Sequence, residues 1–145
     1  MNKKNQSKEI TCSIKGIEIL DFCLIMPTEP LPEEIKIFNF GINTEQKINF
    51  ENKLVYNIVT VEILLEDNIT KLGSLKSNII FEITNFSDYS DTKNQTFNLP
   101  DDLSMVLNSV SISTTRGLMF SQFKGTFLHN AHLPIIDPKQ MKKHQ

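Results

Sequence analysis

The 145-residue sequence predicts a single α+β domain, with a four-stranded antiparallel meander sheet, one long helix packed on it and a short C-terminal extension. Three observations predict this class. Residues 8–86 contain four runs in which apolar and polar residues alternate, which is the period of a β-strand. Residues 100–118 change to a helical period. The connections between the strand runs are short and polar, which favours antiparallel neighbours.

The first strand run covers residues 8–26, and its alternation is interrupted twice. The phase shifts near Gly16 and again near Asp21. Such shifts are typical of a β-bulge, so we expect a long, bent strand. Prolines follow the run at positions 27, 30 and 32, and they predict a stiff, extended connection.

The next three runs cover residues 35–50, 54–65 and 71–86. The polar residues 43–46 predict a turn or kink within the second run. The third run is the clearest strand, because five apolar residues fall on one of its faces: Val55, Val59, Val61, Ile63 and Leu65. In the fourth run, one face carries Ile79, Phe81 and Ile83.

Residues 87–98 are polar and predict a surface loop, after which the spacing becomes helical. Pro100 suits a first helical turn, and Asp101 and Asp102 complement the positive N-terminal end of a helix. The predicted stripe consists of Leu103, Val106, Leu107, Val110, Thr114 and Leu118. The alternative is a strand through the Ser/Thr-rich residues 109–115, whose helix propensity is weak. We expect residues 1–8 and 139–145 to be flexible.

Composition and charge argue against several classes of function. The net charge is −2 and the basic residues are scattered except at the two ends of the chain, so we expect no nucleic-acid binding. No run of 18 apolar residues predicts a membrane span, and no secretory signal precedes the first strand. Cys12 and Cys23 lie in strand runs and are expected to be buried, reduced thiols. We therefore expect a cytoplasmic protein.

No set of residues predicts catalysis, a metal or a cofactor. His129 and His132 are three residues apart and could share a metal, but no cysteine or acidic residue nearby completes a ligand set. Ordinary loop histidines are the simpler interpretation. The glycines do not form a phosphate-binding loop, and no nucleophile lies beside a base. We therefore expect that the protein is not an enzyme.

The order of elements, together with Arg116-Gly117 near the helix end and residues 133–137 (Leu-Pro-Ile-Ile-Asp), resembles the SecB family of protein-export chaperones. The resemblance covers residues 10–138, and the strands at 54–67 and 71–86 resemble the long hairpin of that family. Two features depart from the family. Residues 118–120 replace its Phe-Pro, and the tail is basic where the export members carry an acidic surface. Docking on the translocase motor is therefore doubtful.

The resemblance implies a molecular chaperone that holds unfolded or extended polypeptide in solution, either generally, for export, or for one client such as an antitoxin. It also implies a homo-oligomer, a tetramer or dimer, whose main helices lie between sheets. We expect a peptide-binding groove at Met119, Phe120, Phe123, Phe127 and Phe40, although each of these side chains could equally be core. We expect an oligomer interface at Ser109, Ile112, Ser113 and Arg116, where small side chains allow close helix packing.

Two other classes of function remain open on the sequence alone. The domain could be an interaction module that is not a chaperone and binds one specific folded partner. It could also be a sheet-and-helix domain with a small-ligand pocket or an unrecognised activity. The sequence does not identify the client or the partner.

Overall fold

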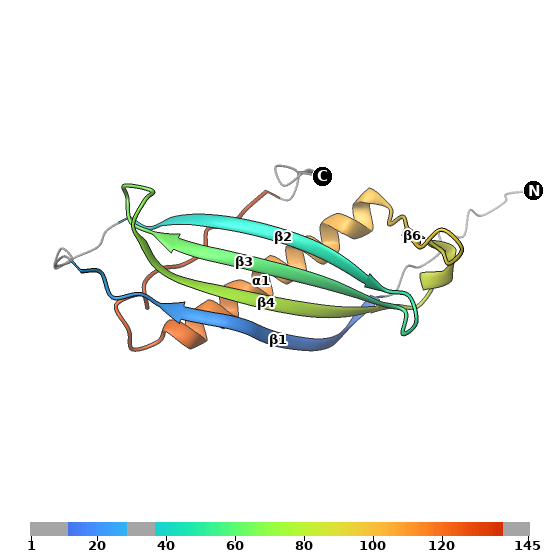
Figure 1. Cartoon of the computed structure of the whole chain (residues 1–145), viewed down its shortest axis with the longest axis horizontal. Helices are drawn as coiled ribbons and strands as arrows, with labels where there is room; N and C mark the ends of the chain where they lie inside the picture. Colours follow the sequence, from blue (N-terminus) through green and yellow to red (C-terminus); the bar gives the residue numbers. More distant parts are fainter. Residues whose placement is uncertain (1–11, 29–36, 138–145) are drawn as a thin grey trace, which may run out of the picture.

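The computed structural model describes residues 12–28 and 37–137, and it has two layers, a sheet and a helix (Figure 1). Both predicted flexible ends, 1–8 and 139–145, lie outside the described residues. The elements are β1 (Cys12–Leu24), β2 (Asn39–Asn49), β3 (Leu54–Leu64), β4 (Lys71–Ile83), η1 (Phe86–Asp88), β5 (Ser90–Asp91), β6 (Thr96–Phe97) and α1 (Asp101–Phe123). The four long strands form the sheet, and α1 crosses one of its faces (Figure 1).

The predicted class, a four-stranded antiparallel sheet with one long helix, is confirmed, but the strand order differs from a simple meander. The order is β1-β4-β3-β2, so only β2, β3 and β4 follow one another as neighbours. β1 pairs with β4, which makes β1 and β2 the two edges of the sheet. β1 and β2 lie at opposite edges of the sheet, so the chain between them joins two strands that are not paired. Most of the predicted proline-containing connection, residues 29–36, lies outside the described residues.

The strands themselves show one confirmed prediction and one correction. The register of β1 shifts between Ile14 and Gly16 and between Ile19 and Asp21, where bulges were predicted. The predicted turn at residues 43–46 is wrong, because β2 stays paired with β3 without interruption. These polar residues are tolerated within a strand because β2 is an edge, half of whose side chains face away from the core.

The helix-facing sides of β3 and β4 form the floor of the core, as the alternation predicted. Two apolar clusters lie between the sheet and α1. One lies toward the C-terminal end of α1 and includes Val59, Val61, Ile63, Met119 and Phe123. The other lies toward its N-terminal end and includes Val55, Ile79, Phe81, Leu103 and Leu107.

The helix was predicted correctly, but the side that it buries was predicted only in part, at Leu103 and Leu107. Its buried residues are Leu103, Leu107, Ser111, Ile112, Thr115, Met119 and Phe123. Val106, which belonged to the predicted stripe, is half exposed. Steps of four residues advance about 40° beyond a full turn, so the contact line winds around the helix as α1 crosses the strands at an angle. The expectation missed Ser111 and Thr115 because they are polar.

The predicted surface loop at 87–98 contains a little more order than expected. The strands β5 and β6 form a two-stranded hairpin within it. Phe97 packs on Phe86, with ring centroids 4.6 Å apart, and so attaches the hairpin to the core cluster at the N-terminal end of α1.

Candidate functional site

The helix covers β3 and β4 but leaves part of β1 open. Side chains directly opposite each other in an antiparallel pair share a face, and four apolar residues of β1 lie opposite helix-facing residues of β4. These residues are Ile14, Ile17, Ile19 and Phe22, and each is between 39% and 49% exposed. We call this set the β1 strip. At its end, the strip contacts the helix through Phe22, whose ring centroid lies 5.1 Å from that of Phe123.

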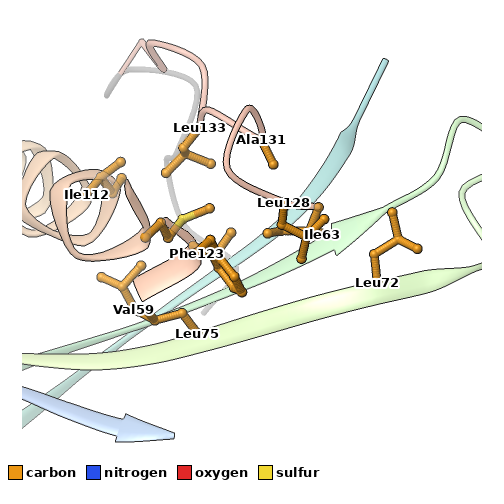
Figure 2. Packing of buried hydrophobic residues seen from close by; sticks show 11 residues of the cluster. Val59, Ile63, Leu72, Leu75, Ile112, Phe123, Leu128, Ala131 and Leu133 are labelled. Carbon is orange, nitrogen blue, oxygen red and sulfur yellow. The ribbon is translucent and has the colours of Figure 1, made fainter. Parts of the chain in front are cut away.

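On the other side of α1, the chain's own residues 124–137 cover the sheet. Gly125 adopts a positive φ of 79°, a conformation that glycine accepts readily, just after the helix ends. The chain then returns across the helix-bearing face of the sheet toward β2 (Figure 1). Leu128, Ala131 and Leu133 are buried in the cluster that contains Ile63 and Ile112 (Figure 2). We call residues 124–137 the C-terminal segment.

Gly73 of β4 makes the close packing of this region possible. A Cβ atom at position 73 would lie 2.8 Å from Leu128 Cδ1 and 2.9 Å from the carbonyl oxygen of Cys23. It would also lie 3.4 Å from Phe123 Cε1. Because real side chains do not approach so closely, the C-terminal segment and the end of α1 rest directly on the backbone of β4.

Arg116 holds the C-terminal segment against the helix. Its Nε donates to the carbonyl oxygen of Leu133 at 2.7 Å, and its NH2 group donates to that of Pro134 at 2.8 Å. One turn later, the ring of Phe120 stacks on His132 with centroids 6.2 Å apart. A single charged side chain therefore binds two successive main-chain carbonyls of an extended chain.

The five predicted groove residues fall into three environments. Met119 and Phe123 are 2% and 1% exposed, so they are core residues, the alternative that the sequence left open. Phe40 and Phe127 are half-buried and pack against the same cluster. Phe120 is 58% exposed and is the one of the five that presents most of its ring to solvent.

The four predicted interface residues divide in a similar way. Ser113 is exposed and Ser109 is half-buried. Ile112 is buried in the cluster at the C-terminal end of α1, and Arg116 is bonded to the C-terminal segment. Ser113 therefore presents its side chain to solvent, whereas Ile112 and Arg116 make contacts within the chain.

Within residues 12–28 and 37–137, no group of three His, Cys, Asp or Glu side chains is placed to hold a metal ion. His129 Nδ1 lies 2.9 Å from the carbonyl oxygen of Thr126, and the two cysteines are free and half-buried.

The pKa of Asp67 is held below its usual range, mainly by the hydroxyl of Thr70 and then by backbone amides, in the turn between β3 and β4. Across the part of the chain that the structure describes, no helix has the length and apolar character needed to cross a bilayer.

Sequence reasoning missed the β1 strip and the bonds of Arg116. Alternation identified the apolar residues of β1, but their exposure depends on where α1 lies. One local signal was available for the helix, since residues 103, 107, 111, 115, 119 and 123 are spaced by four and include every buried residue of α1 except Ile112.

The comparisons with known proteins identify the fold. No family model matches the sequence, and a search of curated proteins finds no match. Among solved structures, the chain is similar to the Mycobacterium tuberculosis Rv1957 SecB-like chaperone in complex with a ChAD peptide from the Rv1956 HigA1 antitoxin. The TM-score is 0.60 at 8% identity, over 86% of this chain and 90% of that one. The fold is therefore SecB-like, as the element order suggested.

Proposed function

We propose that this protein is a molecular chaperone that binds unfolded or extended segments of other polypeptides and keeps them soluble. The observation that carries the proposal is the incomplete burial of apolar side chains around the C-terminal end of α1, where Phe120 is 58% exposed and Phe40 and Phe127 are only half-buried over the core cluster. Exposed apolar surface of this kind suits contact with other chains. The SecB-like fold, found in a chaperone that was solved with an antitoxin peptide, supports the same proposal.

The groove that we propose lies at the C-terminal end of α1, on the side toward β2. Phe120 contacts the client directly, and Phe40 and Phe127 border the groove. Met119 and Phe123 form its floor from within the core. Phenylalanine and methionine suit clients of varied sequence, because they offer large apolar area without demanding a hydrogen-bond partner.

The second apolar surface, the β1 strip, is proposed to join two copies of the chain. β1 is an edge strand, so its outer backbone groups have no neighbouring strand among the described residues. An isologous contact between two β1 edges would cover the strip. Ser109 and Ser113 are proposed to take part in a separate helix contact between copies, whereas Ile112 and Arg116 make contacts within the chain. We propose a homodimer or homotetramer on this basis.

The mass of the purified protein, measured by light scattering, tests the chaperone proposal. We expect an oligomer that gains the mass of a chemically unfolded, reduced client and keeps it soluble. The same client in its native, oxidised form is the control and should not bind. A protein that ignores the unfolded client would overturn the proposal, and tight binding of one folded partner would then support an interaction module instead.

A matched pair of variants locates the groove. Phe120→Ser removes an exposed ring at the proposed groove, and Ile69→Ser removes an 83% exposed side chain from the turn between β3 and β4. We expect the first variant to hold the client more weakly and the second to behave as wild type. Equal behaviour of the two variants would exclude Phe120 as a contact residue.

A further inference from the structure

Part of the C-terminal segment lies in the structure as an extended peptide would lie in a groove. Residues 131–137 form neither helix nor strand. Ala131 and Leu133 are buried, Ile136 packs half-buried against the same cluster, and Ile135 is 94% exposed. Apolar side chains thus enter the cluster at intervals of two and three residues, while Pro134 and Ile135 face outward.

The main chain of this stretch is recognised without regard to sequence. The two bonds from Arg116 reach the carbonyls of Leu133 and Pro134, which every residue type possesses. A charged, forked donor holds two such acceptors in one orientation. Main-chain contacts to two carbonyls, together with a few buried apolar side chains, are what a binder of varied extended chains requires.

We propose that residues 131–136 are an internal ligand that occupies the polypeptide-binding groove, and that a client segment displaces them. This inference rests on the proposed function and identifies the class of client. The displacing segment is extended, carries a large apolar residue in the place of Leu133 and another three positions later, and presents its carbonyls to Arg116.

The stretch is suited to release, because it lacks the hydrogen-bonded ladder of a strand and the internal bonds of a helix. Segments of this kind open at a lower free-energy cost than the core elements. Because the internal ligand is tethered, it competes at a high effective concentration and weakens the apparent affinity for a client. Because the apparent affinity for a client is low, the internal ligand stays in the groove until the concentration of unfolded chain is high.

A pair of neighbouring variants tests the competition in the full-length protein. Ile136→Ser weakens the internal ligand at its half-buried anchor, whereas Ile135→Ser changes the exposed residue beside it. The probe is a fluorescent peptide from a reduced, unfolded client, titrated with each protein. We expect Ile136→Ser to lower the apparent Kd by roughly three- to tenfold and Ile135→Ser to leave it unchanged. An unchanged or higher Kd for Ile136→Ser would overturn the inference.

A spectroscopic measurement gives an independent answer if Ile136→Ser is poorly folded. A spin label at Ile135→Cys, with Cys12→Ser and Cys23→Ser, reports the mobility of the segment. Saturating client should increase that mobility. If the client binds by light scattering but the label does not change, the chaperone function stands and the internal ligand is refuted. If neither the wild-type protein nor Ile136→Ser binds any client, both proposals fall.

Discussion

The amide nitrogen Nδ2 of Asn57 on β3 donates a hydrogen bond to Ser111 Oγ on α1 at 3.1 Å, in a part of the core where neither side chain is more than 3% exposed. Asn57 Nδ2 also donates to Asn108 Oδ1, and Asn57 Oδ1 accepts from Gln46 of β2. One buried amide therefore connects two strands and the helix, between the two apolar clusters.

A second buried contact extends this polar band to β4. Thr115 Oγ1 donates to the carbonyl oxygen of Ser111 at 2.7 Å, so its proton is already used. Ser77 Oγ, 2.8 Å from Thr115 Oγ1, is therefore the donor in their contact. Because a buried polar group without a partner is costly, a helix shifted or rotated on the sheet would lose these bonds together. The band thus fixes the rotation of α1, and with it the outward direction of Phe120.

The first prediction concerns this band. Asn57→Ala removes the side chain to which Gln46, Asn108 and Ser111 are all hydrogen-bonded. The side-chain amides of Gln46 and Asn108 and the hydroxyl of Ser111 then each lose one partner. We expect the free energy of unfolding to fall by about 1–3 kcal/mol, measured by urea denaturation. Asn43→Ala, on an exposed position of β2, is the control and should change it by less than about 0.5 kcal/mol. Equal losses in the two variants would show that the band contributes nothing specific.

Two glycines give opposite expectations for the same substitution. Gly73→Ala forces a methyl group against Leu128 and the carbonyl of Cys23, and we expect a loss of about 1–3 kcal/mol in unfolding free energy. Gly117→Ala meets no atom within 4 Å inside α1, so it should stabilise the protein by about 0.5–1 kcal/mol. Thermal and urea unfolding of both variants check the sign. A stable Gly73→Ala would mean that the C-terminal segment does not rest on β4.

The phenylalanines at 120 and 123 should separate a surface role from a core role. Phe123→Ala removes a ring that is 1% exposed, so we expect a loss of about 3–5 kcal/mol in stability. Phe120→Ala removes a ring that is 58% exposed and should cost less than about 0.5 kcal/mol. Urea titrations measure both. A large loss for Phe120→Ala would identify its stacking on His132 as structural and would weaken its assignment to the groove.

The features that the sequence predicted correctly are those that depend only on the local spacing and type of residues. The alternating apolar residues of β3 and β4 identified their buried faces, because a strand turns every second side chain to one side. The bulges of β1 followed from the same rule. The start of α1 followed from Pro100 and the two aspartates after it, which need no information about the rest of the chain.

What the sequence did not predict depends on contacts between distant elements. The pairing of β1 with β4 has no local signal, and the exposure of the β1 strip depends on the line that α1 takes across the sheet. Ser111 and Thr115 were overlooked because a search for apolar stripes skips polar residues, even though their partners at Asn57 and Ser77 also lie on buried faces. The assignment of Met119 and Phe123 to a groove floor or to the core needed the same tertiary information.

The last prediction concerns self-association through the β1 strip. Ile17 lies opposite Ile79 on the helix side of the sheet and is 49% exposed, so a charged residue there faces solvent in the separate protomer but would be buried between two β1 edges. Lysine on an edge strand is also a common way to block pairing with another edge. We expect Ile17→Lys to lower the light-scattering mass toward that of one chain without a comparable loss of protomer stability. Ile69→Lys, which changes an exposed residue of the β3–β4 turn, should leave the mass unchanged.

If the Ile17 variant keeps the wild-type mass, the strip does not join two copies. If it separates the copies and the monomer still holds an unfolded client, the two apolar surfaces serve different partners, because the groove that we propose beside Phe120 is formed by one chain alone.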